Sequence, residues 1–130
     1  MTGITTIPAE ITQVVRSAVL TELGGAAADI EEASTTYEKE EHPDRFQEPL
    51  ERFDALRALL NAVGWSNVTV PIGLDEHGER LAHVLHERLE LDRDYISDLG
   101  EQETAERLSV EDEIAGIERF LAENGLTEDS

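Results

Sequence analysis

The 130-residue chain contains no cysteine and has one methionine, one tryptophan and a single lysine, Lys39. Without cysteine it can form no disulfide, thiolate metal site or iron–sulfur cluster, and it has no cysteine nucleophile. Its first residues lack a basic segment followed by an apolar run, and no stretch reaches the roughly 20 apolar residues of a membrane span. We therefore expect a soluble, cytoplasmic protein that has no contact with membranes.

Basic residues are scarce: 10 lysines and arginines stand against 30 aspartates and glutamates, for a formal net charge of -20. A field of that sign repels nucleic acid and anionic lipid, so direct binding to DNA or RNA is not expected. Three interpretations of the acidity remain open: a well-solvated surface, adaptation to high salt, and mimicry of a nucleic-acid backbone for a basic protein. The hydrophobic fraction, 39%, supports one domain over residues 1–130.

Apolar residues recur in four segments at the three-to-four spacing of amphipathic helices. The spacing predicts helices over about 8–40, 45–63, 74–99 and 110–124. Gly64 and Gly125 supply stop signals, and Ser109 lies at the start of a capping-box pattern before the last helix. In the first helix, Gly24 and Gly25 predict either a kink or the close approach of a neighbour.

Residues 65–73 form the one stretch without helical periodicity, and the run Val68-Thr69-Val70-Pro71 favours extended backbone. We interpret this stretch as a strap that crosses over between the second and third helices. The pattern as a whole predicts an all-α fold, an antiparallel four-helix bundle with a non-helical crossover strap between helices 2 and 3. Trp65 opens the strap, either as a lid over the core or as an exposed anchor for a partner.

Five ionisable residues occupy positions on the apolar stripes of two helices. They are Glu22 and Asp29 in the first helix, and His77, Arg88 and Asp92 in the third. Burying an unpaired charge is very costly, so these residues call for partners. Arg88 and Asp92 are four residues apart and can pair along the helix, and Arg88 can instead reach Glu22 or Asp29 if the two helices are neighbours.

These five residues have three interpretations. The first is a structural network of salt bridges that fixes the register between helices. The second is a polar pocket inside the bundle that binds a small ligand or a metal, as facing helices do in other bundles. The third is a face that contacts another subunit or another protein.

Two of the histidines offer a possible metal site, whereas the common catalytic motifs are absent. His83 and His86 are three residues apart and could hold a divalent ion with Glu79, Glu87 or Glu90, although the helical wheel puts both on the charged face. No Glu-x-x-His pair, Gly-x-Ser-x-Gly elbow or phosphate-binding loop occurs in the chain. We therefore predict no catalytic residues and no required cofactor, with a divalent metal as the alternative.

The sequence favours a small acidic protein without enzymatic activity that works through protein–protein interaction or self-association. Its partner would be another protein or a second copy of the chain. The contact surface would be an acidic helix face or an apolar seam beside Trp65. The alternatives are a helical bundle that binds a metal or a small molecule, and an acidic mimic of nucleic acid that binds a basic protein.

Overall fold

The computed structural model describes residues 3–34, 43–100 and 103–126. In this part of the chain the elements are β1 (Ile4–Ile7), α1 (Ala9–Ala33), α3 (Pro43–Val63), β2 (Val70–Gly73), α4 (Leu74–Asp98) and α5 (Thr104–Glu123). The all-α class is confirmed, since four helices account for most of the described residues and the one sheet has only two short strands.

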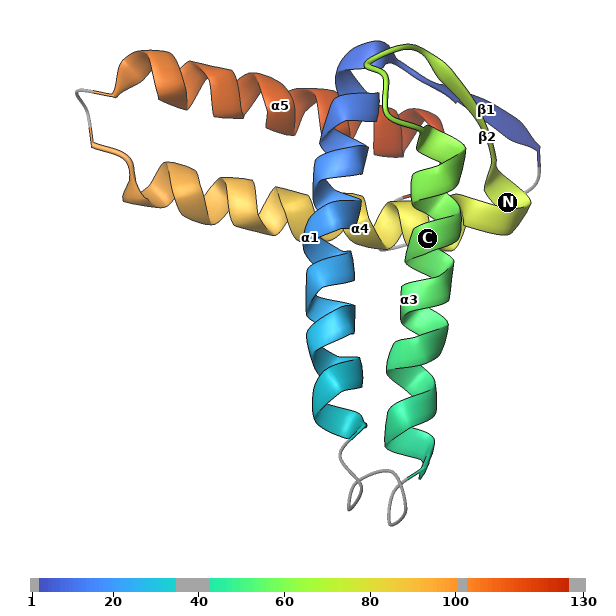
Figure 1. Ribbon diagram of the computed structural model, residues 1–130. Coiled ribbons are helices and arrows are strands. Elements are labelled where there is room, and N and C mark those ends of the chain that lie inside the picture. The colour runs from blue at the N-terminus through green and yellow to red at the C-terminus, as the bar shows by residue number, and fades with distance from the viewer. Residues whose placement is uncertain (1–2, 35–42, 101–102, 127–130) are drawn as a thin grey trace.

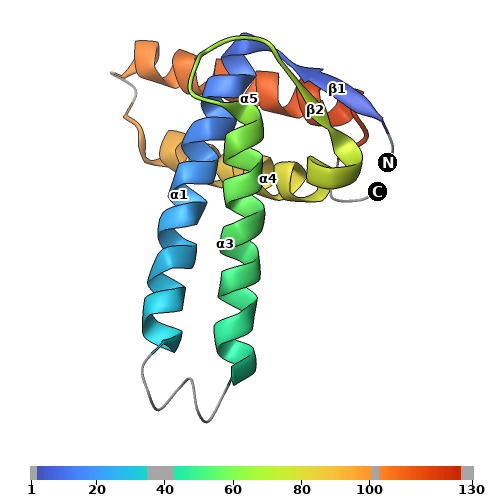
Figure 2. The same ribbon diagram turned by 45° about the vertical axis from the view of Figure 1, so that its right-hand side comes forward.

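The helices form two antiparallel pairs, and the pairs lie crosswise (Figures 1 and 2). One pair is α1 with α3, and the other is α4 with α5. The α1–α3 pair extends past α4, so its outer half forms a projecting arm whose two helices pack only on each other (Figure 1). The helices thus form a bundle of two crossed pairs, in which the four do not share one axis.

A short antiparallel sheet pairs β1, which precedes α1, with β2, which lies between α3 and α4 in the chain. Ile4 of β1 pairs with Gly73 of β2, and Ile7 pairs with Val70. The predicted strap is indeed non-helical, but its second half is strand β2, and its partner β1 was not predicted. Strand β2 ends at Gly73 and α4 begins at the next residue, in the crosswise direction of the second pair (Figures 1 and 2).

The hydrophobic core lies where the two helix pairs cross. Each strand contributes one fully buried side chain, Ile7 from β1 and Ile72 from β2. The helices supply further large apolar side chains that are fully buried, among them Val15, Val19, Leu56, Leu59, Leu81, Val84, Leu85 and Ile117. Burying each such side chain contributes about 1.5–3 kcal/mol. Thr12 is buried among them, and its hydroxyl donates a hydrogen bond to the Pro8 carbonyl at 3.1 Å.

Glycine ends two of the helices, as predicted. Gly64 follows α3 with φ of 76°, and Gly125 follows α5 with φ of 66°. At the second end, the Leu126 N–H donates to the Leu121 carbonyl at 2.8 Å and the Gly125 N–H to the Ala122 carbonyl at 3.3 Å. These two bonds make a Schellman motif, in which Leu126 folds back and is buried.

The structure corrects two expectations about the helices. The last helix begins at Thr104, so Ser109 lies inside it and does not cap it. The first helix is continuous through Gly24 and Gly25, and a Cβ built on either glycine would meet no atom within 4 Å. Close approach of a neighbour is therefore not the reason for these glycines. The predicted end of the first helix, at about residue 40, lies outside the described residues.

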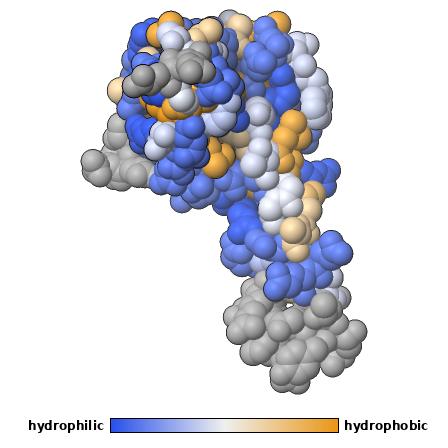
Figure 3. All heavy atoms as spheres, turned by 90° about the vertical axis from the view of Figure 1, so that its left-hand side faces the viewer, coloured by the Kyte–Doolittle hydropathy of each residue, from blue (hydrophilic) through white to orange (hydrophobic). Residues whose placement is uncertain are grey.

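The face of the molecule at the free end of the α4–α5 pair is mostly hydrophilic (Figure 3). Seen toward the free end of the α4–α5 pair, apolar side chains appear only in small patches and in a narrow strip toward the projecting arm (Figure 3). Across the described ranges, no helix has the length and apolar character required to cross a membrane.

Candidate functional site

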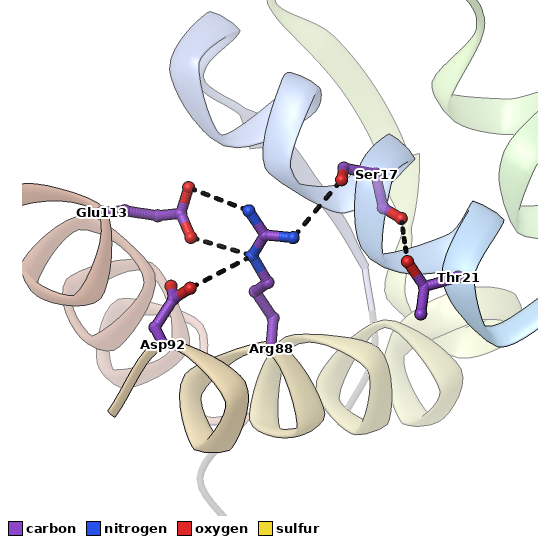
Figure 4. A network of polar contacts seen from close by, with 5 residues as sticks. All are labelled: Ser17, Thr21, Arg88, Asp92 and Glu113. Carbon is purple, nitrogen blue, oxygen red and sulfur yellow. Dashed lines mark hydrogen bonds and ion pairs between the residues drawn. The ribbon is translucent and has the colours of Figure 1, made fainter. Parts of the chain in front are cut away.

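Arg88 and Asp92 of α4 meet as their spacing predicts. The Arg88 Nε atom lies 3.4 Å from the Asp92 Oδ1 atom. A third residue, Glu113 of α5, joins them: Arg88 Nε donates to Glu113 Oε2 at 2.9 Å, and Arg88 Nη2 lies 3.4 Å from Oε1. The remaining nitrogen, Nη1, donates to the Ser17 hydroxyl of α1 at 3.3 Å (Figure 4). One guanidinium therefore joins three helices.

Asp92 is the most constrained member of this network. Asp92 is 7% exposed, and its Oδ2 atom is buried without a hydrogen-bond partner among the described residues. Burial raises the pKa of Asp92 to about 7, assisted by a hydrogen bond with Glu113 and by the Glu113 charge and opposed by Arg88. A carboxylate can only accept hydrogen bonds, whereas a protonated carboxyl can donate one. Protonated Asp92 can therefore share its proton with Glu113.

Glu113 and Arg88 hold the opposite charges of the network. Burial alone would raise the pKa of Glu113, but hydrogen bonds with Asp92 and Arg88 outweigh it and lower that pKa. The hydrogen bond with Glu113 raises the pKa of Arg88 further above its ordinary value. Near neutral pH the network therefore holds one guanidinium, one carboxylate and one carboxyl group that exchanges its proton.

The other three predicted residues lie elsewhere. Asp29 is exposed in the projecting arm, where it forms an ion pair with Arg52 of α3. His77 is nearly buried near the start of α4, with its Nε2 atom 3.7 Å from Glu76 Oε2. Glu22 is half-buried on α1 and is not among the contacts of Arg88. A single network of all five residues does not form.

The paired histidines do not gather a metal site. His83 is exposed, whereas His86 is half-buried and its Nε2 donates to the Leu126 carbonyl at 3.0 Å. Across the described ranges, no group of three or more histidine or acidic side chains is arranged to hold a metal ion. The His86 bond instead ties α4 to the turn that ends α5.

A pocket of about 360 Å³ opens between α1, α4 and α5, and Ser17, Arg88 and Glu113 of the network line it. Its lining residues are Glu10, Ile11, Gln13, Val14, Ser17, Arg88, Asp112, Glu113 and Gly116. Ile11, Val14 and Gly116 give it an apolar part, and Glu10, Asp112 and Glu113 give it carboxylates. The volume is within the range of small-molecule sites, and it also suits one long side chain of a partner.

The charges of the pocket do not cancel. Arg88 is the only basic residue in the lining, and it is engaged by Glu113 and Asp92. Glu10 and Asp112 are exposed, and no hydrogen bond or ion pair to another described side chain engages either carboxylate. The pocket therefore presents two uncommitted negative charges beside an apolar surface.

A second, shallower depression adjoins the pocket on α1. Arg16 lines it and holds the segment after α3, donating to the carbonyls of Gly64 at 2.8 Å and Ser66 at 2.6 Å and to Asn67 Oδ1 at 2.7 Å. Trp65 lies between these anchored residues and is 70% exposed. It is therefore not a lid over the core, and its role as a contact residue stays a prediction.

Glu113 is one of the site residues that the sequence analysis missed, and Glu10 and Asp112 of the pocket are two others. Glu113 precedes Ile117 by four residues and Leu121 by eight, and both of these are buried. A charged residue on an apolar stripe was the signal that singled out Arg88 and Asp92 on α4. The same signal, applied to the last helix, would have found Glu113.

Comparisons with family models, curated proteins and solved structures found no match to this chain. The chemistry of the pocket is therefore what bears on function.

Proposed function

We propose that this protein acts by binding a basic polypeptide partner, which places a lysine or arginine side chain in the pocket between α1, α4 and α5. The observation that carries the proposal is the combination of an apolar lining with the two uncommitted carboxylates of Glu10 and Asp112. The alkyl stem of a basic side chain would cover Ile11 and Val14 while its charged end reaches these carboxylates, as such side chains do elsewhere on protein surfaces.

The charge of the whole chain supports the same partner. With a net charge of -20, long-range attraction increases the rate at which a basic partner arrives, and the effect weakens as salt screens it. Each methylene group of the stem that leaves water contributes about 0.8 kcal/mol, so the pocket adds affinity that salt does not remove. Leu20, which is exposed in the adjoining depression on α1, would extend the contact.

The test is a titration of the labelled protein with an arginine-rich peptide, followed by NMR, with a neutral peptide of equal length as reference. We expect amide shifts to concentrate at Gln13, Ser17 and Gly116, which line the pocket. The double variant Glu10→Gln/Asp112→Asn should weaken binding about tenfold, because each lost contact with the cation costs on the order of 0.5–1 kcal/mol.

A matched control removes the same charge elsewhere. Glu79 and Glu90 are exposed on α4 and do not line the pocket. The variant Glu79→Gln/Glu90→Gln should weaken binding by about threefold or less, through the long-range field alone. Equal losses in the two double variants would show that the peptide binds the whole acidic surface, and the pocket would have no special role.

Salt separates this proposal from self-association. Two copies of a chain with a charge of -20 repel each other, so a homo-oligomer should strengthen as salt increases, whereas a basic partner should bind less tightly. Light scattering and peptide binding at about 50 mM and about 500 mM salt distinguish the two, since the screening length falls about threefold over that range.

A further inference from the structure

We propose that binding of a cationic group in this pocket releases a proton from the carboxyl pair of Asp92 and Glu113, so that affinity for the partner increases with pH through neutrality. The inference rests on the proposed function, and it makes binding at this site depend on pH. Its basis is the geometry of the pocket wall, where two carboxyl groups share one guanidinium.

The position of Asp92 makes its proton part of the structure. More than nine-tenths of the residue is buried, and its Oδ2 atom has no donor among the described residues. As a carboxylate, Asp92 would leave this oxygen unsatisfied and would repel the neighbouring Glu113. As a carboxyl, Asp92 can donate a hydrogen bond to Glu113. Burial and this bond both favour the protonated form, and they raise the pKa of Asp92 to about 7.

The groups that act on this proton come from each of the three helices. Arg88 of α4 attracts the Asp92 carboxylate, and Glu113 of α5 opposes its ionisation. On the α1 side, the nearest contact is the neutral hydroxyl of Ser17, which binds Arg88. Glu10 of α1 and Asp112 of α5 are further carboxylates in the lining of the same pocket.

A bound cation reverses this balance. Arg88 and Glu113 line the pocket, so Asp92 lies one contact behind its surface. With Asp92 protonated, the charges of Arg88 and Glu113 cancel and this three-residue network is neutral; with Asp92 ionised, the network carries one net negative charge. A guanidinium or ammonium group in the pocket therefore favours the ionised form. By linkage, binding releases up to one proton, and raising the pH strengthens binding.

The experiment is calorimetric titration of the full chain with the arginine-rich peptide at about pH 7, in two buffers that differ in heat of ionisation. The difference in measured heat gives the number of protons released, and we expect about half a proton per peptide. Between about pH 6 and about pH 8, the dissociation constant should fall about fivefold.

The variant Asp92→Asn tests whether Asp92 is the source of the released proton. The carboxamide is nearly the same shape as the carboxyl and can donate to Glu113, so the variant should bind the peptide with little proton release. Asp94→Asn is the matched control on the same helix, at an exposed position, and it should release protons as the parent does. The chain also contains four histidines, so the difference between the parent and Asp92→Asn is the decisive quantity.

The possible outcomes separate the two proposals. Peptide binding without proton release would overturn this inference and leave the proposed function intact. No binding at any pH would overturn both. Undiminished proton release by Asp92→Asn would show that another group is responsible. If that variant does not fold, carbon NMR of the Asp92 carboxyl in the parent chain provides the test. The inference requires that the bound peptide lower the pKa of Asp92. An unchanged pKa contradicts the inference.

Discussion

Replacing Asp92 with asparagine should stabilise the protein at alkaline pH and leave it nearly unchanged at acidic pH. The native state keeps a proton on Asp92 up to about pH 7, whereas the unfolded chain loses it near the ordinary value of 3.8. A native state that binds more protons than the unfolded state loses stability as pH rises. The loss extends from about pH 4 to about pH 7 and is complete above that. Asparagine carries no such proton and avoids the loss.

The magnitude follows from the two pKa values. From 3.8 to about 7 is about three pKa units, and each unit corresponds to about 1.4 kcal/mol, so ionisation of Asp92 costs the native state about 4 kcal/mol. At about pH 8.5 we expect the free energy of unfolding of Asp92→Asn to exceed that of the parent by about 3 kcal/mol, since the unfolded chain retains some interactions. Glu113, whose pKa is lowered, contributes stability that is lost only at more acidic pH.

Urea denaturation at about pH 5.5 and about pH 8.5 measures the effect, with m-values compared to confirm that the same surface is exposed. The exposed residue Asp94, two positions along the helix, provides the control Asp94→Asn, whose effect should not change with pH. If the difference between Asp92→Asn and the parent is the same at both pH values, Asp92 does not keep its proton in the native state. The explanation of the network would then be wrong.

Four other substitutions test the description of the fold. Gly24→Ala and Gly25→Ala should each stabilise by about 0.5–1 kcal/mol, seen as a higher melting temperature, because both glycines are within α1 and a Cβ has open space. Gly125→Ala should destabilise by about 1 kcal/mol, because its φ of 66° strains any residue with a Cβ; an unchanged melting temperature would contradict the Schellman motif. Arg16→Lys should lose about 1–2 kcal/mol and lower the fluorescence anisotropy of Trp65, since lysine lacks the fork that binds three acceptors.

The helices were predictable because their signal is local. The apolar spacing and the glycine stops at Gly64 and Gly125 depend only on neighbours within a few turns. The sheet was not predictable, because Ile4–Ile7 is too short to show alternation and its partner β2 lies more than 60 residues away in the chain. The crosswise arrangement of the pairs was equally hidden, since periodicity shows which face of a helix is buried and not what buries it.

The site was predictable in part for the same reason. Arg88 and Asp92 pair within one helix, so their spacing was sufficient. Asp29 was misassigned because it lies in the projecting arm, where α1 packs on α3 alone and a residue on the apolar stripe can still reach water and Arg52. The pocket itself required three helices from distant parts of the chain, and no local pattern contains that information.

The composition of the pocket wall favours a binding role over a purely structural one. One carboxylate would be enough to neutralise Arg88, and Glu113 already binds it through both oxygens. Asp92 adds a second carboxyl at a buried position, where an excess negative charge lowers stability once it ionises. A purely structural contact between helices would not be stabilised by Asp92 at neutral pH. A pocket that accepts a cation does gain, because the incoming charge compensates the carboxylate that the fold alone leaves unbalanced.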